Sequence, residues 1–170
     1  MENLKTIEEL VSIKSNNTDS NIEIINYLIK RFSPYSEQIL KIKTNNSNIY
    51  NLLIGINTKI SNTKAIILSG HIDTVVAEEK AYNTNPYYAT QIGNKVFGLG
   101  IIDMKCYFAT IIDNLQKLKE TNLPIIIAIT GDEETKFKGI QLLTQTLIQR
   151  RVWPHLLNHW RTNKSLSLYC

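Results

Sequence analysis

Two short apolar segments most constrain the fold of this chain. Residues 65–68 (AIIL) run into a Ser-Gly pair, and residues 124–130 (PIIIAIT) run into a glycine followed by three acidic residues. Apolar runs of this length, bounded by turn residues, are typical of strands buried on both faces of a sheet. Between them, residues 104–119 place apolar side chains three and four positions apart, as a helix does. The sequence therefore predicts an α/β domain with helices packed on a central sheet.

The same patterns predict the other elements. Apolar periodicity indicates helices over residues 3–13, 21–32 and 137–149, and short β-rich runs indicate strands over 37–43, 49–56 and 95–97. The chain has 170 residues, of which 43% are hydrophobic and 20% charged, as in ordinary globular domains.

Composition also narrows the partners and the compartment. The longest apolar stretch is far shorter than a membrane span, so no membrane association is predicted. The lysines are dispersed and do not alternate with aromatic residues, which argues against nucleic-acid binding. The acidic first ten residues do not resemble a secretory signal, and the two cysteines form no C-x-x-C pair. We therefore expect a cytoplasmic protein.

Polar clusters stand where the two buried strands are predicted to end. His71 and Asp73 follow the first strand, and Glu133 and Glu134 follow the second, while Asp103 lies at the start of the 104–119 helical pattern. Ligands of α/β sheets collect beyond the carboxyl ends of the strands. One imidazole among several carboxylates suits zinc or a harder metal ion. The clusters together predict a metal centre.

The chemistry of each residue type indicates a role. His71 is a good zinc ligand, and Asp73 could hold its second ring nitrogen. Asp103 has two carboxylate oxygens and could bridge two metal ions. Of Glu133 and Glu134, one could bind metal while the other serves as the base for a metal-bound water.

Each cluster also has a structural interpretation. The His71 and Asp73 pair could form a loop hydrogen bond, and Asp103 could be the N-cap of the helix that follows. The acidic run at 132–134 could be a solvated surface that favours the N-terminal end of a helix. From the residues alone, both interpretations of each cluster stay open. The occurrence of all three clusters in one chain favours the metal centre.

Three linked segments resemble a known family in the family's own order. They read SGHIDTVVA, NPYYATQIGNKVFGLGIIDMK and AITGDEET. They are similar to the motifs of the M20 metallopeptidases and deacylases, and most similar to those of the acetylornithine deacetylases, which are related to the succinyl-diaminopimelate desuccinylases. The resemblance covers residues 1–149. It implies a layered α/β/α zinc-aminopeptidase-like domain with a mixed central sheet.

The resemblance also implies specific roles. His71, Asp103 and Glu134 would be metal ligands, Asp103 would bridge the metals, and the complete site would hold two zinc or cobalt ions. Glu133 would be the general acid and base, and Asp73 would orient His71. The implied substrate is a small N-acyl amino acid, N-acetylornithine in arginine biosynthesis, with N-succinyl-diaminopimelate or a dipeptide as alternatives. Proteins of this family form homodimers.

The sequence departs from the family pattern at two places. Cys106 stands where the family has glycine. Residues 1–149 match the N-terminal part of the catalytic domain, whereas the later Gly-Glu-Pro-Thr ligand segment and the lid and dimerisation domain have no counterpart. These differences predict a C-terminally truncated domain with impaired activity. An inactive remnant, a metal-binding module or a purely structural domain are the alternatives.

Residues 150–170 form an anomalous tail. Both tryptophans and three of the four arginines of the chain fall there. For one permitted choice of codons, a one-nucleotide shift of the reading frame over residues 157–162 would encode Leu-Ile-Ile-Gly-Glu, as the family resemblance leads us to expect. The tail therefore predicts a local frameshift that is compensated near Thr162. His159 lies beside the position of the missing glutamate and could replace it, although a solvent-exposed histidine is the simpler interpretation.

Overall fold

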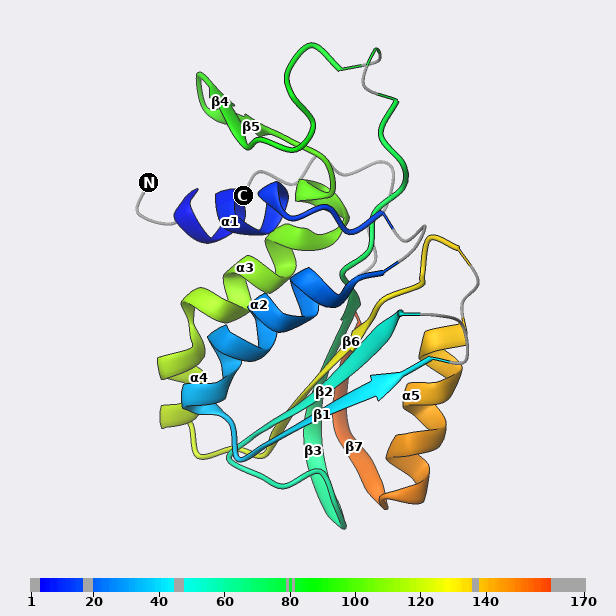
Figure 1. Cartoon of the computed structure of the whole chain (residues 1–170). Helices are drawn as coiled ribbons and strands as arrows, with labels where there is room; N and C mark the ends of the chain where they lie inside the picture. Colours follow the sequence, from blue (N-terminus) through cyan, green and yellow to red (C-terminus); the bar gives the residue numbers. More distant parts are fainter. Residues whose placement is uncertain are drawn as a thin grey trace.

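A five-stranded mixed sheet forms the centre of the molecule (Figure 1). The computed structural model describes residues 4–16, 20–44, 48–78, 80, 82–135 and 138–159. Across the sheet the strands lie in the order β1 (Gln38–Lys43), β2 (Tyr50–Ile56), β6 (Ile125–Thr130), β3 (Thr63–His71) and β7 (Val152–His159). The pairs β1–β2 and β2–β6 are antiparallel, whereas β6, β3 and β7 run parallel to one another. The predicted mixed sheet is thus confirmed.

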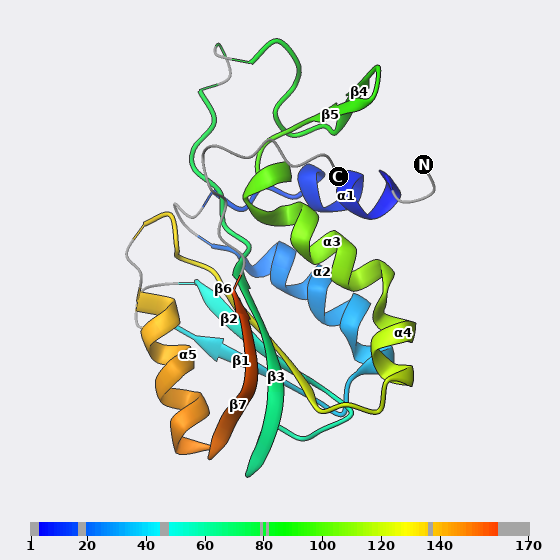
Figure 2. The same cartoon turned by 180° about the vertical axis from the view of Figure 1, so that it is seen from behind.

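Helices cover both faces of this sheet (Figures 1 and 2). One face packs against α1 (Leu4–Ser12), α2 (Ile22–Phe32) and α3 (Cys106–Asp113), with α4 (Leu115–Glu120) continuing from α3. The other face packs against α5 (Lys138–Gln149). The layered α/β/α architecture is therefore confirmed. No helix in the described part of the chain has the length and apolar character that a membrane span requires.

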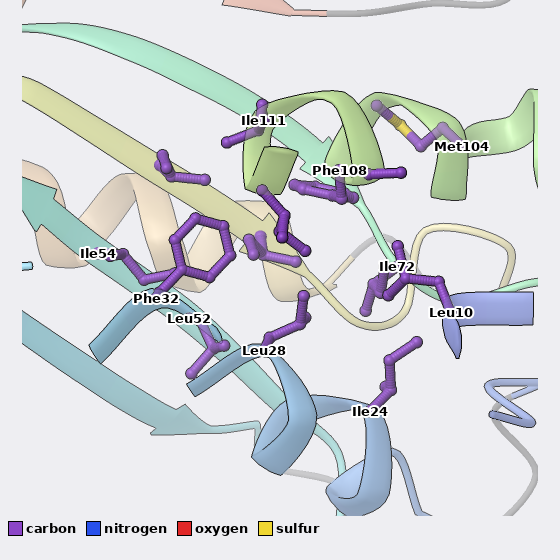
Figure 3. Close-up of a cluster of buried hydrophobic side chains, with 14 of the residues drawn as sticks. Leu10, Ile24, Leu28, Phe32, Leu52, Ile54, Ile72, Met104, Phe108 and Ile111 are labelled. Atoms are coloured by element: carbon purple, nitrogen blue, oxygen red, sulfur yellow. The ribbon is translucent and has the colours of Figure 1, made fainter. Parts of the chain in front are cut away.

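The central strand β6 explains why the sheet has two apolar layers. All six of its residues are buried, and alternate side chains point to opposite faces. Ile125, Ile127 and Ile129 belong to the larger core beneath α1, α2 and α3, whereas Ile126 and Ala128 belong to the smaller core beneath α5. Figure 3 shows the larger core, where side chains from the helices meet those of β2. The labelled members are Leu10, Ile24, Leu28, Phe32, Leu52, Ile54, Ile72, Met104, Phe108 and Ile111.

The predicted helix over 104–119 is wrong at its start and at its middle. The chain forms an irregular turn, η3 (Ile101–Lys105), in which Asp103 and Met104 have non-helical backbone angles. The residue before the first turn of α3 is Lys105, so Asp103 is not the N-cap of this helix. Asn114, with φ −110° and ψ 14°, separates α3 from α4. The apolar periodicity is real, but the residues at 103–104 serve the site described below.

The tail contributes a strand that the sequence did not predict. β7 pairs in parallel with β3, and the register places His159 beside Ser69. The carboxyl ends of β6, β3 and β7 therefore meet at one edge of the sheet. Residues 160–170 lie outside the described residues, and the frameshift remains a prediction. Above this edge stands the hairpin of β4 (Thr90–Ile92) and β5 (Lys95–Phe97), of which the second strand was predicted (Figure 1).

Candidate metal centre

His71 is the last residue of β3 and lies at the edge where the parallel strands end. Its residue surface is 6% exposed. Nδ1 is 3.1 Å from the main-chain oxygen of Asp73, and Nε2 is 2.9 Å from Oδ1 of Asp103. Both ring nitrogens are therefore held, which fixes the orientation of the imidazole. The main-chain carbonyl of Asp73 is closer to Nδ1 than its carboxylate, whose Oδ1 lies 3.6 Å away.

Asp103 reaches His71 because the chain turns sharply just before it. Gly100 has φ 75°, a left-handed conformation that favours glycine, and a Cβ there would lie only 2.5 Å from Thr74 Cγ2. This close approach brings the η3 turn against the segment that follows β3. The peptide bond between Asp103 and Met104 is cis. The Asp103 side chain is 47% exposed, so its carboxylate is partly accessible to solvent.

Glu133 and Glu134 lie in the loop that follows β6, the strand next to β3. The Asp73 carboxylate, which is fully buried, holds this loop. Its Oδ1 accepts the Glu133 main-chain N–H at 3.1 Å, and its Oδ2 accepts the Glu134 N–H at 2.9 Å. Glu133 Oε2 then lies 4.0 Å from His71 Nε2. Asp73 is thus the link between the two strand ends.

The structure brings all five predicted residues together. One ligand atom from each of His71, Glu133 and Glu134 lies within 4.8 Å of the other two, and Asp103 contacts the same imidazole. An imidazole nitrogen and carboxylate oxygens are the donors that zinc binds in proteins. The donor set of the described residues therefore fits a zinc ion.

The electrostatics of the cluster favour a cation. Burial by itself lowers the pKa of His71, but the hydrogen bonds and charges of Asp73 and Asp103 outweigh it and raise this pKa to about 9. Burial raises the pKa of Glu134, and the neighbouring carboxylates add to the increase. Without a metal ion, the imidazolium proton thus balances part of the negative charge. A divalent cation would compete for the same nitrogen and neutralise the same carboxylates.

Two residues that support this cluster were missed by the sequence analysis. Met104 was predicted only as part of an apolar helical stripe, yet its Sδ accepts the main-chain N–H of His71 at 3.3 Å. Lys105 was assigned no role. It is 1% exposed, and its Nζ donates to the carbonyls of Leu10 and Ile13 at 2.8 Å each. Burial lowers the pKa of Lys105 to about 8. The Asp-Met-Lys motif was the available signal, but it does not reveal these partners.

Comparison with known proteins gives the same family by two routes. The model of peptidase family M20/M25/M40 matches residues 67–163, more than half of the chain. An acetylornithine deacetylase of Buchnera aphidicola subsp. Acyrthosiphon pisum is 33% identical over 149 residues, which cover 85% of this chain and 38% of that protein. An acetylornithine deacetylase of Salmonella arizonae is 38% identical over 87 residues, covering 50% of this chain and 23% of that protein.

Solved structures share the fold at low sequence identity. Human carnosine dipeptidase 1 has a TM-score of 0.73 and 16% identity, with 94% of this chain and 39% of the dipeptidase covered. The aminopeptidase PepT of Bacillus cereus has a TM-score of 0.62 and 23% identity, with 81% of this chain and 38% of PepT covered. The chain thus spans less than two fifths of the length of these relatives.

Proposed function

Because the chain belongs to peptidase family M20/M25/M40, we propose that it is a metal-dependent amidohydrolase that removes the acyl group from an N-acyl amino acid. One observation carries this proposal: His71, Glu133 and Glu134 converge within 4.8 Å, and Asp103 lies against the same imidazole. The names of the curated relatives support N-acetylornithine as the substrate, with acetate and ornithine as products.

The residues of this chain divide the work between binding and proton transfer. His71, Asp103 and Glu134 would hold zinc or cobalt. Bound metal would polarise the acyl carbonyl and acidify the attacking water. Asp73 would keep the Glu133–Glu134 loop in place through its two main-chain hydrogen bonds.

Glu133 would act as the general base and acid. Its carboxylate lies 4.0 Å from His71 Nε2, and its side chain is 37% exposed, so it faces the ligand cluster and can still reach a substrate. It would accept a proton from the attacking water as the new C–O bond forms. It would then deliver that proton to the amine nitrogen as the C–N bond breaks, which releases ornithine and acetate.

The test combines metal analysis with turnover. We would measure zinc bound per purified chain, then the hydrolysis of N-acetylornithine, N-succinyl-diaminopimelate and a dipeptide in parallel. Glu133→Gln should retain zinc and lose about 10²- to 10⁴-fold in turnover, because Gln cannot transfer the proton. Glu120→Gln is the matched control, since Glu120 is exposed and its carboxylate accepts a hydrogen bond from the Gln116 side chain at 2.7 Å.

The outcomes separate the alternatives. Two zinc ions and turnover of N-acetylornithine support the proposal, and preferred turnover of another substrate changes the substrate assignment. If the chain binds zinc but hydrolyses none of the amides, it is a metal-binding module and not an enzyme for these substrates. A chain that binds no zinc is contrary to the proposal, as is a Glu133→Gln variant as active as Glu120→Gln.

A further inference from the structure

Asn51 is a buried polar residue of the apolar sheet, near the start of β2. It belongs to β2 and is fully buried. Its Oδ1 accepts the main-chain N–H of Gly131 at 3.1 Å, and its Nδ2 donates to the main-chain carbonyl of Gly139 at 3.1 Å. A buried amide requires partners for both its donor and its acceptor. Asn51 finds both in the same stretch of chain.

The two partners of Asn51 lie on either side of the acidic residues. Gly131 follows β6 directly, and Gly139 lies in the first turn of α5. Glu133 and Glu134 lie between them. One side chain on a rigid strand therefore fixes where this segment leaves the sheet and where it enters the helix.

Asp132 completes the same arrangement. Its Oδ1 accepts the main-chain N–H of Gly139 at 2.8 Å, so both main-chain polar groups of Gly139 are bonded to side chains. The fit is tight, because a Cβ on Gly139 would lie 2.9 Å from Asn51 Oδ1 and still closer to Asp132. The buried amide thus leaves little freedom at the end of the segment.

We propose that Asn51 is a positioning residue that holds the Glu133–Glu134 segment against His71. This inference rests on the proposed function for its purpose, since the segment carries a candidate metal ligand and the candidate general base. Asn51 acts through the main chain of Gly131 and Gly139. Only an amide of this size offers both the acceptor and the donor.

A second asparagine provides the matched control. Asn57 follows β2 at its opposite end, and its Nδ2 donates to the carbonyls of Leu118, Lys119 and Leu123 at 3.0 to 3.3 Å. It therefore also fixes a distant segment through its amide, but that segment carries none of the candidate site residues. Its φ of 57° is readily adopted by glycine, so Asn57→Gly removes the amide without backbone strain.

The experiment compares Asn51→Leu, Asn51→Asp and Asn57→Gly in the full chain. Amide hydrogen exchange of the metal-free protein reports how often the hydrogen bonds of this segment open. Asn51→Leu should accelerate exchange at Glu133 and Glu134 by about tenfold or more, as their bonds to Asp73 open more often. Asn51→Asp keeps the acceptor for Gly131 but sets a carboxylate oxygen against the Gly139 carbonyl, so it should also accelerate exchange at Glu133 and Glu134. If Asn51→Leu does not fold, Asn51→Asp carries the test. Asn57→Gly should accelerate exchange only around residues 118–123.

Zinc affinity, measured by calorimetry, is the second readout. Residues that support a metal ligand typically contribute about 10- to 100-fold to affinity. Asn51→Leu should weaken zinc binding by such a factor, and Asn57→Gly should leave it unchanged. Unchanged exchange at Glu133 and Glu134 in the Asn51 variants overturns the inference, as does an equal loss of zinc affinity in Asn57→Gly. A wild-type chain that binds no zinc refutes the proposed function, while the exchange data still decide the role of Asn51.

Discussion

Replacing Asp73 with Asn tests how strongly the candidate site is tied together. The Asp73 carboxylate is fully buried and accepts the main-chain N–H groups of Glu133 and Glu134 at 3.1 and 2.9 Å. Asn has nearly the same shape, so the substitution leaves no cavity. Its carbonyl oxygen can still accept one of these amides. Its NH2 group then points a donor at the other amide, which loses its partner.

The size of the effect follows from these two contacts. A hydrogen bond to a charged group contributes about 1.5–3 kcal/mol, and an orphaned buried donor costs about 1–3 kcal/mol. Removing a buried carboxylate offsets part of this loss, because its desolvation penalty disappears as well. We therefore expect Asp73→Asn to lower the free energy of unfolding by about 2–4 kcal/mol.

The assay is urea unfolding of the chain in the presence of a chelator, so that metal binding does not contribute to the measured stability. Asp113→Asn is the control, because Asp113 is exposed and accepts a hydrogen bond from Thr6 that Asn can also accept. It should cost less than about 1 kcal/mol. If Asp73→Asn lowers the free energy of unfolding no more than Asp113→Asn does, the Asp73 carboxylate does not hold the Glu133–Glu134 loop.

Three further substitutions test other parts of the structure. Lys105→Met removes both hydrogen bonds to the end of α1 and should accelerate hydrogen exchange in that helix about tenfold. Unchanged exchange would mean that these two hydrogen bonds do not hold the end of α1. Gly139→Ala should destabilise the chain by about 1–3 kcal/mol in urea unfolding, since the new Cβ presses on Asn51 and Asp132, and a net gain from helix propensity contradicts this. Burial raises the pKa of Tyr107 from 10.0 to about 12, so the unfolded chain ionises first and stability falls as the pH rises through this range. The free energy of unfolding of Tyr107→Phe should fall less steeply with pH than that of the wild-type chain. Equal pH dependence in the two proteins would mean that Tyr107 does not cause the loss of stability.

Local patterns predicted much of the sheet and most helices correctly. The alternation of β6 across two apolar layers follows from an apolar run that must be buried on both faces. The predicted site residues also come together, because the carboxyl ends of parallel neighbours meet at one edge. Those of β3 and β6 are paired in register up to His71 and Thr130. Strand direction alone therefore explains why polar residues after the two strands converge.

The residues that the sequence did not reveal act through contacts distant along the chain. The bond from Asn51 to Gly131 spans 80 positions, and that from Lys105 to Leu10 spans 95. An asparagine inside a predicted strand is locally unfavourable, because an amide requires partners that an apolar sheet does not supply. Its presence in β2 becomes understandable only when the fold brings Gly131 and Gly139 to it. β7 was missed for a related reason, since Pro154 weakens the strand pattern but lies beside Ala65, where the register shifts.

The wrong helix prediction at residues 104–105 marks the place where the site overrides local preference. Three consecutive side chains there contact three different parts of the molecule. Asp103 meets the His71 ring, Met104 accepts the His71 main-chain N–H, and Lys105 binds the carbonyls at the end of α1. In a regular helix, successive side chains are about 100° apart, and they project toward its N-terminal end. The non-helical angles of Asp103 and Met104 allow one short segment to present a ligand, support the histidine and anchor α1. Sequence reasoning fails here because the backbone follows the requirements of the site.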